Sequence, residues 1–86
     1  MIAYLEKPEL SMATLKRFAR CKIAIYSDDH HPAHFHIEGR GFRLVVEIET
    51  MRVRAGGCRK VYEALSWAAE NIELLRSEWN RLNRRG

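Results

Sequence analysis

The chain has 86 residues, of which 47% are hydrophobic and 30% charged, and its formal net charge is +4. This length supports one hydrophobic core, and this composition excludes a disordered chain. The sequence has no apolar run long enough to span a membrane and no signal peptide, so we expect a cytoplasmic protein.

The N-terminal residues 1–11 are expected to form an extension or arm, because Pro8 interrupts them and Met12 follows directly. Residues 12–86 are expected to form a single compact α+β domain. Alternating apolar residues predict strands over residues 21–27, from His34 onward, over 42–49 and over 52–55. The apolar side of these strands is the set Ile23, Ile25, Phe35, Ile37, Leu44, Val46 and Ile48.

Helical spacing replaces strand alternation after Gly56-Gly57. Asn71 can cap a new helix, so we expect one long helix or two with a break near Glu70-Asn71. The apolar stripe of this region is Val61, Ala64, Leu65, Ala68, Ile72, Leu75, Trp79 and Leu82. The stripe must be buried against the apolar sheet face. The predicted fold is therefore a three- to four-stranded antiparallel sheet followed by one or two C-terminal helices on one face.

The opposite sheet face is expected to be open to solvent, because the helices cover the apolar face. A polar, histidine-bearing open face is a suitable site for a ligand or a partner. Its predicted residues are Tyr26, His34, His36, Glu38, Arg43 and Glu47.

All four histidines of the chain lie between His30 and His36. His34 and His36 leave the same face of a strand, about 6.5–7 Å apart at the backbone. Their imidazoles can therefore bind one metal ion, with His30, Asp29 or Glu47 as the third ligand. Such a cysteine-free set suits a divalent metal, zinc or manganese among others, with an open position for an activated water.

Two metal-free interpretations of the histidines stay open. In the first, His34 and His36 act as general base and general acid, Asp29 orients His30, and Arg43 stabilises phosphate charge, as a ribonuclease requires. In the second, the histidines only hold the loop and hairpin in shape, and Asp29 bonds backbone N–H groups. The candidate catalytic residues are Asp29, His30, His34 and His36.

Basic residues gather before the first predicted strand, around Gly56-Gly57 and in residues 81–85. This distribution fits an acidic partner, either nucleic acid or protein, although solubilising charge explains it equally well. The candidate nucleic-acid-binding residues are Arg17, Arg20, Lys22 and Arg43.

Several short motifs together resemble a known family. They are Ala13-Thr14-Leu15, Arg17-Phe18, Ile-x-Ile-Tyr ending at Tyr26, Asp29-His30-x-Pro32-x-His34-Phe35-His36, Ile48-Glu49-Thr50, and a last helix with Leu75 and Trp79. Over about residues 12–84 the chain resembles the small bacterial domain-of-unknown-function family 4160. That family's most specific motif is Asp-His-x-Pro-Pro-His-Phe-His, in which Ala33 here replaces the second proline and His31 takes the variable position. The usual Gly-x-Leu-Pro segment before the helix is replaced by Gly56-Gly57-Cys58-Arg59-Lys60.

The resemblance implies a partner protein. Genes of this family resemble one half of toxin–antitoxin-like pairs, and the usual neighbour is a small protein of domain-of-unknown-function family 2442. Our leading hypothesis is therefore a toxin-like component that binds or acts on RNA or DNA through the histidine cluster, as a nuclease-like hydrolase if it is an enzyme. The alternative is a non-enzymatic, antitoxin-like or regulatory module that binds a partner protein or DNA. Formation of a homodimer is left open.

Overall fold

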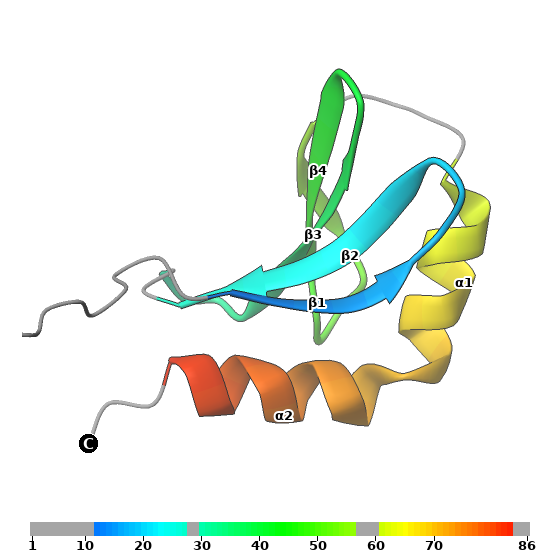
Figure 1. Cartoon of the computed structure of the whole chain (residues 1–86). Helices are drawn as coiled ribbons and strands as arrows, with labels where there is room; N and C mark the ends of the chain where they lie inside the picture. The colour runs from blue at the N-terminus through cyan, green and yellow to red at the C-terminus, as the bar shows by residue number, and fades with distance from the viewer. Residues whose placement is uncertain (1–11, 28–29, 57–60, 84–86) are drawn as a thin grey trace, which may run out of the picture.

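The computed structural model describes residues 12–27, 30–56 and 61–83. Five strands come first: β1 (Met12–Arg17), β2 (Cys21–Tyr26), β3 (His34–Gly39), β4 (Phe42–Glu47) and β5 (Val53–Ala55). Two helices follow, α1 (Tyr62–Glu70) and α2 (Ile72–Leu82). The strands form one antiparallel sheet in chain order (Figure 1). The predicted α+β class, with an antiparallel sheet followed by C-terminal helices, is confirmed.

The sheet has five strands, so the predicted number of three to four is wrong. The additional strand, β1, pairs with β2, but its register shifts between Thr14 and Lys16. Such a bulge interrupts the two-residue alternation by which a strand is recognised in a sequence. Lys16 and Arg17, which were expected to precede the first strand, therefore lie inside β1.

Both helices pack against the same face of the sheet (Figure 1). Ile23, Ile37 and Leu44 are direct neighbours across three strands, so their side chains lie on one face. The predicted apolar sheet residues are all buried, and Leu75 and Trp79 of α2 are 0% and 2% exposed. The core is thus the interface between this face and the helical stripe, and each large side chain buried there contributes roughly 1.5–3 kcal/mol.

The helical region is broken at the predicted position, since α1 ends at Glu70 and α2 begins at Ile72. Asn71 is the N-cap residue of α2, as predicted, and its carbonyl oxygen accepts a hydrogen bond from the Leu75 N–H, but its side chain makes no cap hydrogen bond to α2. Its Nδ2 instead donates to the carbonyl oxygen of Trp67, at 2.8 Å, and its backbone N–H donates to the carbonyl oxygen of Ala68. Asn71 therefore closes the end of α1 and turns the chain into α2.

No helix within residues 12–27, 30–56 and 61–83 has both the length and the apolar character needed to cross a membrane. The predicted N-terminal extension, residues 1–11, lies outside the described residues.

Candidate functional site

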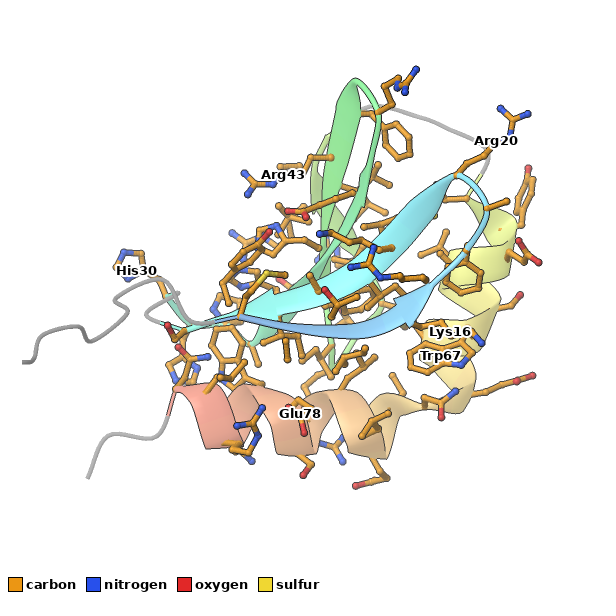
Figure 2. All side chains as sticks on the ribbon, viewed as in Figure 1. Lys16, Arg20, His30, Arg43, Trp67 and Glu78 are labelled. Atoms are coloured by element: carbon orange, nitrogen blue, oxygen red, sulfur yellow. The ribbon has the colours of Figure 1, made fainter. Side chains whose placement is uncertain are left out.

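The sheet face turned away from the helices carries a row of charged side chains close to the two hairpin turns. The row consists of direct cross-strand neighbours on β1 to β4: Arg17, Lys22, Glu38 and Arg43. Figure 2 shows Arg43 projecting from β4 on this side, away from both helices. Three of the four predicted nucleic-acid-binding residues thus share one row, and the fourth, Arg20, lies in the β1–β2 turn.

Glu38 connects this row to Tyr26. Its Oε2 accepts a hydrogen bond from the Tyr26 hydroxyl at 2.7 Å and one from Arg43 Nε at 3.2 Å. Burial acts to raise the pKa of Glu38, but these two hydrogen bonds outweigh it, and the pKa lies below its ordinary value. Burial and the bond to Glu38 raise the pKa of Tyr26. The group therefore consists of a neutral phenol, a carboxylate and a guanidinium at neutral pH.

His36 lies on the same face, two residues along β3 from Glu38, or about 7 Å. Its ring packs at 4.9 Å from the Tyr26 ring, in a T-shaped arrangement, and at 5.2 Å from the His34 ring. Because of these neighbours His36 is 7% exposed, although this face was expected to be open. His36 is thus a packed residue, and a substrate would reach it only by displacing Tyr26 or His34.

His34 begins β3 and lies half-buried beside α2. Its ring is 5.1 Å from the Trp79 ring, and the ring of His31 lies 5.6 Å from the same indole. His34 Nδ1 is 2.9 Å from the carbonyl oxygen of Pro32, which can only accept, so this nitrogen carries the proton. In neutral His34 the lone pair is therefore on Nε2. The His31–Pro32 peptide bond is cis.

The histidines do not all converge. His30 is exposed, and Figure 2 places it beyond the end of the sheet. Across the described stretches of the chain, no three His, Cys, Asp or Glu side chains form a group that could hold a metal ion. The described residues thus offer a pair of adjacent imidazoles, His34 and His36, but no third ligand. Asp29, the remaining predicted catalytic residue, lies outside the described residues.

Basic residues also converge at the hairpin turns. Two adjoining hollows open there, with volumes of about 510 and 560 Å³, and Arg40 lines both. Gly39 allows this convergence, because a Cβ at that position would lie 2.6 Å from the carbonyl oxygen of Arg20 in the neighbouring turn. The basic residues lining the hollows are Arg17, Arg20, Lys22 and Arg40, which we call the hairpin-end cluster.

The hairpin-end cluster differs in its pairing from four other arginines of the described residues. Arg43, Arg54, Arg76 and Arg81 each form an ion pair with a glutamate. Among residues 12–27, 30–56 and 61–83, no carboxylate forms an ion pair with any member of the cluster. The carboxylate that lines one of the hollows is Glu38, which already bonds Tyr26 and Arg43. The cluster is therefore a site of uncompensated positive charge.

Two residues of the site were missed in the sequence. Arg40 was not among the predicted site residues, although the antiparallel pairing of β2 with β3 brings its turn to the same end of the sheet as Lys22. Trp79 was assigned to the core, where it is 2% exposed, but it also carries the rings of His31 and His34. The contact between the rings of His31 and Trp79, which lie 48 residues apart in the chain, leaves no signal in local spacing.

Residues 21–80, more than half of the chain, match the model of a family described as a domain of unknown function, DUF4160. No curated protein and no solved structure matches the chain.

Proposed function

The chain belongs to the DUF4160 family, and from that premise we propose that it is the nucleic-acid-binding, non-enzymatic component of a toxin–antitoxin-type module in the cytoplasm. The observation that carries the proposal is the hairpin-end cluster, in which four cations converge without ion pairs among the described residues. Its partner would be the small family-2442-like protein expected from the resemblance.

Phosphate is the ligand that best suits the hairpin-end cluster. Arg17, Arg20 and Arg40 carry guanidinium groups, which bind phosphate oxygens in a bidentate manner. When a phosphate replaces the water and counterions bound to an unpaired surface cation, little favourable interaction energy is lost. An arginine such as Arg54 must first break its ion pair with Glu47. The polyanionic backbone of RNA or DNA would therefore contact this end of the sheet before any other described surface.

In this proposal the histidines have a structural role. His36 is buried between Tyr26 and His34, and His34 and His31 pack against Trp79. These contacts join β3 and its preceding loop to α2 and keep Tyr26 in reach of Glu38. The histidines thus support the charged row without contacting the nucleic acid.

The test is the salt dependence of binding, measured by fluorescence anisotropy with a labelled oligonucleotide. The variant R17Q/R20Q/R40Q should bind at least tenfold more weakly at low salt. The slope of log affinity against log salt should fall by about 2 to 3, because each lost phosphate contact removes roughly 0.7–0.9.

The matched control is R54Q/R76Q/R81Q, which removes the same net charge from arginines that are already paired. Its affinity should stay within about threefold of the unsubstituted protein, since distant surface charges are screened. Equal loss in the two triple variants would contradict a defined site and indicate only a general effect of net charge.

A second candidate function, a nuclease-like toxin, is favoured by the geometry of His34 and His36. Nε2 of neutral His34 carries the lone pair, and the two rings are 5.2 Å apart. Such a pair could act as acid and base, or supply two ligands to zinc or manganese if a third ligand joins them. The decisive variant is His34→Gln, because His36→Ala is expected to disturb the fold. If His34→Gln removes growth inhibition and RNA cleavage but retains the melting temperature, the result favours the nuclease-like toxin.

A further inference from the structure

Tyr62 is the most exposed large hydrophobic side chain among the described residues, at 78%. It opens α1, and its neighbour Glu63 is close enough to Cys21 to raise the pKa of that thiol, after the larger effect of burial. Cys21 follows Arg20 directly, and Figure 1 shows the β1–β2 turn next to the start of α1. The first residues of α1, Tyr62 among them, therefore lie beside the β1–β2 turn that carries Arg20 of the hairpin-end cluster.

The other aromatic rings around the cluster are already engaged. Tyr26 has the His36 ring at 4.9 Å and the Arg43 guanidinium at 5.9 Å. Phe18 is half-buried with Lys16 over its ring, and Phe42 packs where a Cβ of Gly39 would lie. Tyr62, in contrast, makes no ring contact or hydrogen bond within the described parts of the chain.

We propose that Tyr62 is a base-stacking residue and that the nucleic acid bound by the hairpin-end cluster is single-stranded. This inference rests on the proposed function. Proteins that bind single strands combine cations along the phosphate backbone with exposed aromatic rings on which bases stack. In a duplex the bases are stacked on each other, so an exposed tyrosine beside a phosphate site has no base to accept.

The geometry also limits what the site can recognise. A single exposed ring provides a stacking surface that accepts any base, whereas base identity is read by hydrogen bonds to base edges. The polar groups of the hairpin-end cluster are all cations, which contact phosphate regardless of sequence. Binding should therefore discriminate strongly between single and double strands and weakly between sequences.

The experiment compares three labelled probes with the full chain at one low salt concentration: a dT oligonucleotide of about twelve nucleotides, the same backbone with abasic sites, and a duplex of equal length. The unsubstituted protein should bind the dT strand about tenfold more tightly than the abasic strand. Tyr62→Ala should lose this tenfold preference and bind the dT and abasic strands equally, whereas Tyr62→Trp should keep or increase the preference.

The control is Leu74→Ala, which truncates another exposed apolar side chain on the outer side of α2, at 41% exposure. It should leave all three affinities unchanged. A dT-to-abasic ratio unaffected by Tyr62→Ala, or tighter binding of the duplex, would overturn the stacking inference while the cluster still bound phosphate. Absence of binding to all three probes would instead overturn the proposed function, and the inference with it.

Discussion

The two faces of the sheet are organised by different interactions. On the helix-covered face, Ile23, Phe35 and Ile37 are completely buried against Leu75 and Trp79, and packing alone fixes their positions. On the other face, hydrogen bonds, ring contacts and charges order the side chains from Arg43 through Glu38 and Tyr26 to His36. The first face determines whether the protein folds, and the second determines what it can bind. A series of substitutions can test this division.

Trp79 should give the largest effect, because it belongs to the core and also carries the rings of His31 and His34. Trp79→Ala is expected to lower the free energy of unfolding by about 3–5 kcal/mol, measured by urea denaturation. Trp67→Ala is the comparison. Because Trp67 is only partly buried, this substitution should lower the free energy of unfolding clearly less. Equal losses at the two positions would contradict the larger structural role assigned to Trp79.

His36 should give the next largest effect, although it lies on the polar face. His36→Ala removes a ring that is 7% exposed and packed between two others, at a cost of roughly 2 kcal/mol. His30→Ala, at an exposed position, should change stability by less than about 0.5 kcal/mol. Urea denaturation of the full chain distinguishes the two variants. An unchanged denaturation midpoint for His36→Ala would refute the structural role of His36.

Glu38 makes the polar face sensitive to acid. Its pKa is lowered in the folded protein, so its contribution to stability is present above its ordinary value of 4.5 and is lost as the pH falls through the folded value. Glu38→Gln should reduce the loss of stability below about pH 4.5, by about 1 kcal/mol, the typical net contribution of one hydrogen bond. Thermal melts at pH 3 and pH 7 give the measurement, and an unchanged pH dependence in the variant would contradict it.

Lys22 should give the smallest effect on stability. It lies in the charged row but forms no ion pair within the described residues. Lys22→Gln should leave the melting temperature nearly unchanged, since isolated surface charges contribute little. The same variant should weaken oligonucleotide binding. A stability loss comparable to that of Glu38→Gln would show that the row is held together as a unit.

The sequence predicted the helix-covered face far better than the polar one. Its seven sheet residues and the helical stripe were identified from periodicity, because burial imposes a repeat of 2 in strands and 3.6 in helices. Strand β1 was not predicted, because its bulge between Thr14 and Lys16 interrupts the alternation. His36 was placed on the correct face, but its burial depends on where Tyr26 and His34 point, and the contact of the His34 ring with Trp79 of α2 was not predicted. Such contacts follow from the twist of the sheet and from α2, and no local pattern encodes them.

The strictly sequential strand order has a consequence for the synthesis of the protein. Each strand can pair with its predecessor as soon as it leaves the ribosome, because every connection is local. The side chains that seal the apolar face, Leu75 and Trp79, are translated only after the sheet is complete. At about 5–20 residues per second, the finished strands β1 to β4 would wait for roughly two to seven seconds until α2 follows. During that interval a nascent sheet with one uncovered apolar face is exposed to chaperones and to its neighbours on the polysome.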